Sequence, residues 1–204
     1  MKRTVLIAAM FLVFMTDAGA QSRDSIPRIT FGAEWSFVVS AFSAYHYNYF
    51  SPEGYRFNVY GSGIDFYNNG EVLLHVGYNF NKHWNLSLYT GMTGLADIHN
   101  AASISLRGSY YFGEDALKDR WMTFMDVGTG ISFKNEPQEI WTGKVGGGYR
   151  ITLSRDTKLD FIAALRLACT HPQIVDGEDK ISLEWTNRNL AFLQSFSLGM
   201  SITF

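Results

Sequence analysis

The sequence predicts an all-β protein, an eight-stranded antiparallel up-and-down transmembrane β-barrel over residues 29–204. The last fifteen residues, LAFLQSFSLGMSITF, alternate large apolar residues with mostly small and polar ones. Side chains on a strand point to opposite faces with period two, so this segment has one apolar and one polar face. Seven earlier segments alternate in the same way, and their charged residues avoid the apolar face. The same pattern in eight segments indicates one continuous sheet.

The first twenty residues have the features of a cleaved secretion signal. Lys2 and Arg3 form a basic start, residues 5–15 are apolar, and Ala18-Gly19-Ala20 is a small-residue cleavage site. We expect cleavage after Ala20 and a short periplasmic segment over residues 21–28. No later run of 18 apolar residues suggests a membrane helix. A membrane protein without such a helix must close its sheet, because lipid offers no partner to open backbone groups.

The eight expected strands cover residues 29–41, 72–80, 84–92, 103–112, 121–131, 141–153, 159–169 and 190–204. In that order their apolar faces carry Phe31, Trp35 and Phe37; Val72, Leu74 and Val76; Trp84, Leu86 and Leu88; Ile104, Leu106 and Tyr110; Trp121, Met125 and Val127; Trp141, Val145 and Tyr149; Phe161, Leu165 and Leu167; and Phe192, Phe196 and Leu198. These lengths suit the roughly 9–11 residues of a tilted membrane strand.

The connections alternate between short turns and longer loops. If both termini are periplasmic, the periplasmic turns are 81–83, 113–120 and 154–158. The extracellular loops are then 42–71, 93–102, 132–140 and 170–189. Short inner turns and long outer loops are typical of membrane barrels.

Charged residues within the strands all fall on the small, polar face. They are Glu34, Arg107, Asp126, Lys144, Arg150, Asp160 and Arg166. A soluble sandwich would also turn charges away from its core, so this pattern alone leaves both folds open. The signal sequence, the terminal Phe204 and the aromatic strand ends favour the membrane. Side chains fill the lumen of an eight-stranded barrel, and buried charges there must pair. We therefore expect an ion-pair network that plugs the lumen, with a gated path for ions or small solutes as the alternative.

Three histidines, His46, His99 and His171, fall in or beside the expected outer loops, with Asp97 near His99. Such residues can bind a metal or serve acyl transfer, but no metal-ligand spacing such as H-x-x-x-H occurs. The plainer interpretation is solvated loop histidines. We assign no catalytic, cofactor-binding or metal-binding residue, and we expect no cofactor.

The first outer loop, 42–71, is unusually aromatic. It contains Phe42, Tyr45, Tyr47, Tyr49, Phe50, Tyr55, Phe57, Tyr60, Phe66 and Tyr67. Aromatic residues at this density are typical of contact surfaces. Because parts of the loop alternate, the sequence leaves two interpretations open: an extension of the first hairpin above the membrane, or a dedicated partner-binding loop.

The chain resembles small Gram-negative outer-membrane β-barrel proteins of the OmpX/OmpA-transmembrane type. The resemblance rests on the eight alternating segments, the short turn 81–83 and the terminal Ile202-Thr203-Phe204. It implies a bacterial outer-membrane location and contact with outer-membrane lipids, including lipopolysaccharide. It also implies recognition of the C-terminal strand by the barrel-assembly machinery. It transfers no active site.

The favoured function is a non-enzymatic barrel whose outer loops contact a surface ligand or a larger outer-membrane complex, with a protein partner at loop 42–71. One alternative is an outer-leaflet lipid-modifying enzyme, for acyl transfer or deacylation, using His46, Asp97 and His171. One family of barrel lipases carries a His-x-Ser pair, but no His in this sequence is followed two residues later by Ser. A second family uses His, Asp and Ser from its outer loops, and His46, Asp97 and Ser103 match it only loosely. The other alternative is a narrow pore. The net charge of −2 gives no basic surplus for nucleic acid.

Overall fold

The computed structural model describes residues 26–64, 66–95, 100–133, 138–171, 174–176 and 179–204. The expected signal sequence, residues 1–20, and residues 21–25 of the expected N-terminal segment lie outside the described residues. No helix among the described residues is long and apolar enough to cross a membrane.

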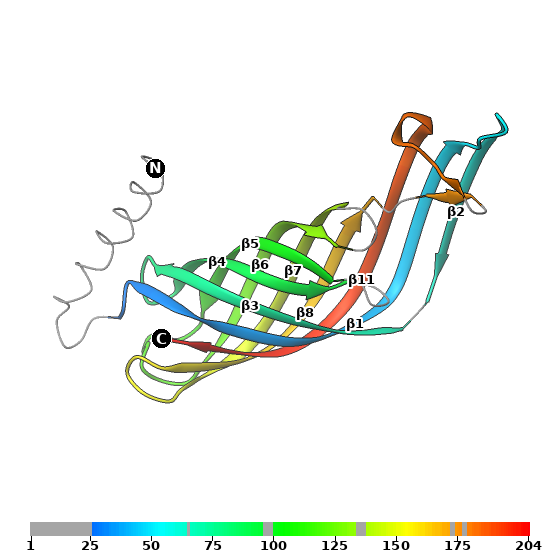
Figure 1. Ribbon diagram of the computed structural model, residues 1–204. Helices are drawn as coiled ribbons and strands as arrows, with labels where there is room; N and C mark the ends of the chain where they lie inside the picture. Colours follow the sequence, from blue (N-terminus) through cyan, green and yellow to red (C-terminus); the bar gives the residue numbers. More distant parts are fainter. Residues whose placement is uncertain (1–25, 65, 96–99, 134–137, 172–173, 177–178) are drawn as a thin grey trace, which may run out of the picture.

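Eight long strands form a closed antiparallel ring (Figure 1). They are β1 (Ile29–Phe50), β3 (Tyr67–Asn79), β4 (Trp84–Gly94), β5 (Asn100–Tyr111), β6 (Arg120–Ser132), β7 (Gln138–Thr152), β8 (Lys158–Thr170) and β11 (Thr186–Thr203). Each strand pairs with the next one in this series, and β11 pairs back with β1. This confirms the predicted fold class.

The smaller elements lie outside the ring. Strand β2 (Arg56–Gly63) pairs with the distal half of β1 and adds a ninth strand to the sheet. The strands β9 (Val175–Asp176) and β10 (Asp179–Lys180) form a short hairpin, which precedes a 3-10 turn, η2 (Leu183–Trp185). None of these elements was predicted, because each falls in a segment expected to be a loop.

The ring closes where the two ends of the chain meet. Near the C-terminus, β1 and β11 pair in register from Gly32–Thr203 to Ser40–Ser195. Phe31 and Phe204 exchange two backbone hydrogen bonds, at 3.1 and 2.8 Å, and their rings stack 5.6 Å apart. The terminal Phe204 therefore takes part in closing the ring, which leaves no open edge along the barrel wall.

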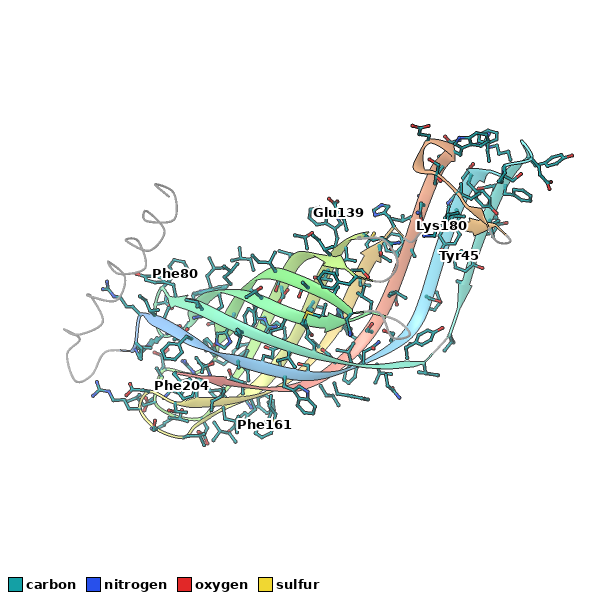
Figure 2. All side chains as sticks on the ribbon, in the orientation of Figure 1. Tyr45, Phe80, Glu139, Phe161, Lys180 and Phe204 are labelled. Carbon is teal, nitrogen blue, oxygen red and sulfur yellow. The ribbon has the colours of Figure 1, made fainter. Side chains whose placement is uncertain are left out.

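The barrel wall is apolar outside and polar inside. Outward side chains such as Trp121 and Leu165 stay 65% and 63% exposed, and Figure 2 shows Phe80 and Phe161 on the outside of the barrel. A soluble monomer does not expose a continuous apolar belt of this size, so the belt is a lipid-facing surface. Aromatic pairs such as Trp121 with Tyr149 lie near the end that carries Phe204, as expected for an interfacial aromatic girdle.

Strands β1 and β11 continue well past the barrel wall, and β2 joins them there. Strand β1 has 22 residues and β11 has 18, whereas a tilted membrane strand needs roughly 9–11. Their pairing continues to Tyr49–Thr186, and β2 pairs with β1 from Ser43–Gly63 to Phe50–Arg56. Residues 42–50, 56–63 and 186–194 thus form a three-stranded extension, which we call the arm (Figure 1).

The structure corrects three predicted boundaries in and beside the arm. Residues 42–50 and 186–189 are strand rather than loop, and β3 begins at Tyr67 rather than at residue 72. The register between β1 and β11 shifts between Ser40 and Phe42. This bulge exchanges the faces of odd and even residues, so an alternation read from residue 29 stops at the bulge although the strand does not. The interpretation of 42–71 as an extended first hairpin is confirmed for its described strands.

Ring closure can be tested with an engineered disulfide across β1 and β11. In a Cys169→Ala background, Trp35→Cys and Met200→Cys should form a disulfide upon mild oxidation, because these residues are direct register partners and paired Cα atoms lie within bonding range. Trp35→Cys with Phe196→Cys is the matched control, offset by roughly 13 Å along the strand. Non-reducing gels give the readout, and equal bonding in both pairs would contradict the register.

Candidate functional site

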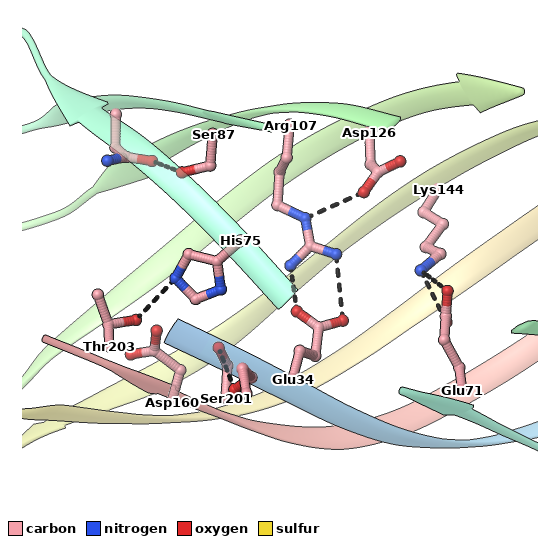
Figure 3. Close-up of polar contacts among 12 residues, drawn as sticks. Glu34, Glu71, His75, Ser87, Arg107, Asp126, Lys144, Asp160, Ser201 and Thr203 are labelled. Atoms are coloured by element: carbon pink, nitrogen blue, oxygen red, sulfur yellow. Dashed lines mark hydrogen bonds and ion pairs between the residues drawn. The ribbon is translucent and has the colours of Figure 1, made fainter. Parts of the chain in front are cut away.

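The lumen holds the first cluster of functional side chains, centred on Arg107 of β5. Its Nη1 and Nη2 groups donate to the two carboxylate oxygens of Glu34 at 2.5 and 3.1 Å, and its Nε donates to Asp126 at 3.1 Å (Figure 3). The rings of Tyr89 and Phe124 lie 4.0 and 4.4 Å from its guanidinium carbon. Two carboxylates and two ring faces surround the guanidinium group, and together they offset the cost of burying its charge.

A second ion pair crosses the lumen between β7 and β3. The Lys144 ammonium donates to both carboxylate oxygens of Glu71, at 2.6 and 2.7 Å (Figure 3). Glu71 was missed as a lumen residue because it lies one position before the predicted strand 72–80. It shares the parity of His75 and Gly77, which were placed on the polar face. Extending that alternation by one residue would have found it.

A third ion pair lies nearer the end that carries Phe204. Arg150 donates to both oxygens of Asp160, its register neighbour on β8, at 2.6 and 2.7 Å. The Arg150 and Arg120 guanidinium carbons lie 4.2 and 4.5 Å from the centre of the Tyr111 ring. Lys158 donates to the carbonyls of the turn at Ser154 and Arg155. The cations at this end are thus held by a ring face and by turn carbonyls as well as by a carboxylate.

All seven predicted inward charges are buried, between 1% and 7% exposed. Six of them form the ion pairs described above. The seventh, Arg166, donates from Nη1 to the Gly94 carbonyl at 2.9 Å. Its Nε and Nη2 atoms have no hydrogen-bond partner among the described residues.

A small cavity lies in the lumen. It has a volume of about 10 Å³ and lies between the Arg107 cluster and the third ion pair, lined by residues that include His75, Tyr89, Arg107 and Arg150. This is room for about one water molecule. His75 Nε2 lies 3.4 Å from the Thr203 hydroxyl, and its ring lies against Tyr89 at 4.8 Å.

The outer-loop histidines do not gather into a site among the described residues. His46 lies on the arm, with Nε2 2.8 Å from Asn58 Oδ1. His171 is exposed just after β8, and His99 and Asp97 lie outside the described residues. Ser103 is on β5, which is separated from β1 by β3 and β4 in the ring. The part of the chain that is described contains no group of three His, Cys, Asp or Glu residues placed to hold a metal.

The arm is the second candidate site. One face continues the lumen side: the rings of Tyr45 and Tyr47 stack at 5.0 Å, and those of Tyr49 and Phe57 at 5.4 Å. Tyr45 lies over Gly61, where a Cβ atom would come within 2.6 Å of the tyrosine oxygen. Ile174 and Ile181, on either side of the β9–β10 hairpin, pack against Tyr49. These contacts make the arm an ordered platform.

The other arm face, which we call the outer face, continues the lipid-facing side of the barrel. The strand register places there Phe42, Ala44, His46, Asn48 and Phe50 of β1, Arg56, Asn58, Tyr60 and Ser62 of β2, and Arg188, Leu190, Phe192 and Gln194 of β11. Tyr60 is 77% exposed. At the arm tip, Phe50, Pro52, Lys180, Ile181, Ser182 and Trp185 line a cavity of about 230 Å³.

Comparison with known proteins identifies the fold. No protein-family model and no curated protein sequence matches the chain. Neisserial surface protein A is similar in structure, with a TM-score of 0.53 and 11% identity over 86% of this chain and 95% of that one. The outer-membrane protein OprG of Pseudomonas aeruginosa gives 0.53 and 13% over the same shares. The chain therefore has the fold of small outer-membrane β-barrel proteins, and the predicted outer-membrane location agrees with this likeness.

The Lys144–Glu71 pair provides a test of the lumen network. Glu71→Leu or Lys144→Met alone should lower the free energy of unfolding by about 3–5 kcal/mol, because each leaves one unpaired charge in the lumen. The double variant should recover most of this loss. Urea unfolding in lipid vesicles, followed by tryptophan fluorescence, measures both effects. Lys118→Met, in an exposed turn pair, is the control and should change little. Additive losses in the double variant would contradict a coupled pair.

Proposed function

We propose that the protein is a non-enzymatic outer-membrane β-barrel whose lumen is plugged by ion-paired side chains and whose arm contacts a protein partner at the cell surface. The observation that carries this proposal is the arm itself, a three-stranded sheet outside the ring. Outer-membrane lipids would contact the apolar belt, and the assembly machinery would recognise β11.

The packing of the lumen supports the plugged state. Glu34–Arg107 and Glu71–Lys144 each join strands on different sides of the ring. A solute would have to separate these pairs, and parting buried charges is costly. The cavity of about 10 Å³ beside them would not hold a solute.

The exposed edge and aromatic surface of β2 support partner binding. Strand β2 is the last strand in the sheet order, and it pairs with β1 along one side. Its sequence, RFNVYGSG, contains neither Lys nor Pro, which often protect exposed strand edges. Tyr55 and Phe66, just before and after β2, are 64% and 72% exposed. An edge that has no strand partner among the described residues and is flanked by aromatic side chains suits a partner that adds its own strand.

The plug can be tested in planar lipid bilayers. The wild-type protein should give no discrete open steps, since the ion pairs fill its lumen. The triple variant Glu34→Ser, Arg107→Ser, Asp126→Ser should conduct, because it removes the central cation together with both of its carboxylate partners and so leaves none of these three buried charges unpaired. Heat-modifiable migration on gels confirms that both proteins are folded. Charge-selective steps in the wild type would overturn the plug.

Partner binding can be tested with photo-crosslinking residues in cells of the native host. A crosslinker at Tyr55 should yield a discrete adduct, whereas one at Phe133, an exposed residue just after β6, should not. The variant Phe57→Ser, Val59→Ser should reduce adduct yield about tenfold, as expected from removal of apolar anchors. Equal adducts at both positions, or no effect of the variant, would contradict docking on the arm.

A further inference from the structure

The outer face of the arm carries a chain of hydrogen-bonded polar side chains. Arg56 Nε donates to Asn48 Oδ1 at 3.1 Å, and Asn48 Nδ2 donates to Asn58 Oδ1 at 3.5 Å. His46 Nε2 lies 2.8 Å from the same Asn58 oxygen, and its ring contacts Tyr60 edge-on at 6.4 Å. These bonds hold the Arg56 side chain over β1.

Two arginines flank Asn48 on this face. Arg188 of β11 is the register partner of Asn48, and Arg56 reaches Asn48 from β2 on the other side. The two strands that carry them are about 10 Å apart, because each lies one strand spacing from β1. Both side chains are exposed. Among the described residues no hydrogen bond or ion pair engages the terminal amino groups of Arg56 or the guanidinium of Arg188.

The charge on this face has one sign. None of the thirteen residues that the register places on the outer face is acidic, whereas Arg56, Arg188 and His46 are basic or can become so. Two guanidinium groups on either side of Asn48 attract an anion, and their planar forks suit a phosphate.

The same face lies directly beyond the lipid-facing belt. Phe192 is exposed on β11 and belongs to this belt, and Asn48 lies about 20 Å farther along the sheet than Phe42. Molecules of the membrane's own outer leaflet therefore meet this face at the level of their head groups, before any free ligand does.

We propose that the outer face of the arm binds the phosphorylated saccharide head group of lipopolysaccharide in the same membrane. Arg56 and Arg188 hold a phosphate on either side of Asn48. Asn58 and His46 face the sugar hydroxyls, and the exposed ring of Tyr60 offers a flat surface to the sugar. This site does not depend on the protein partner proposed above, which uses the free edge of β2.

The test measures binding of deacylated lipopolysaccharide, the soluble phosphorylated saccharide, to the full protein in a zwitterionic detergent by calorimetry. The variant Arg56→Gln, Arg188→Gln should bind at least about tenfold more weakly, because it loses two charge-assisted contacts. The same saccharide after phosphatase treatment should bind the wild type with a similar loss. Added salt should weaken binding of the phosphorylated form.

The control variant is Lys118→Gln, Arg155→Gln, which removes the same charge from turns at the other end of the barrel. It should bind like the wild type, and heat-modifiable migration should be the same for all three proteins. An unchanged affinity in the Arg56, Arg188 variant, an equal loss in the control, or equal affinity for the dephosphorylated saccharide would each overturn the site. None of these outcomes bears on crosslinking at Tyr55, so the two proposals fail separately.

Discussion

The structure depends on one constraint, which is that backbone groups facing hydrocarbon must be paired within the protein. The closure between β1 and β11 meets it, since these strands come from opposite ends of the chain and pair from Gly32–Thr203 onwards. The terminal Phe204 contributes a backbone donor and acceptor to this closure and a ring to the apolar exterior. Once the ring is closed, the two faces of every strand are assigned, one to lipid and one to the lumen.

The lumen then imposes its own requirement. Polar side chains that cannot face lipid are gathered inside a narrow cylinder, where water is scarce and isolated charges are costly. The chain meets this with carboxylates that face their cations across or along the wall: Glu34 to Arg107, Glu71 to Lys144, Asp160 to Arg150. Aromatic rings around Arg107 and Arg150 complete the packing. The same side chains that stabilise the interior also occupy the space through which a solute would pass.

Beyond the barrel wall the constraint is relaxed, and the sheet becomes asymmetric. Strands β1, β11 and β2 form the arm, and the outer edge of β2, which has no strand partner in the described part of the chain, could not exist at membrane depth. One face carries stacked tyrosines covered at the tip by the β9–β10 segment, and the other carries the polar chain from Arg56 to His46. A long arm on one side of a filled barrel supports recognition, rather than transport, as the proposed function.

Alternation alone was enough to predict the eight strands and the inward orientation of all seven charges, because a charge on the lipid side is costly wherever it occurs in a strand. Alternation ends at a bulge, however, and the register shift at Ser40–Phe42 hid the length of β1. The start of β3 at Tyr67, and with it Glu71, was missed although the alternation of β3 continues through these residues. Which carboxylate meets which cation also depends on positions brought together only by ring closure, since Glu34 and Arg107 are separated by 73 residues. The sequence by itself thus determined which side of the wall each residue faces, through a local period of two. Only the tertiary structure decided the partners in the lumen and the height of the arm, because both depend on register between strands that are distant in the chain.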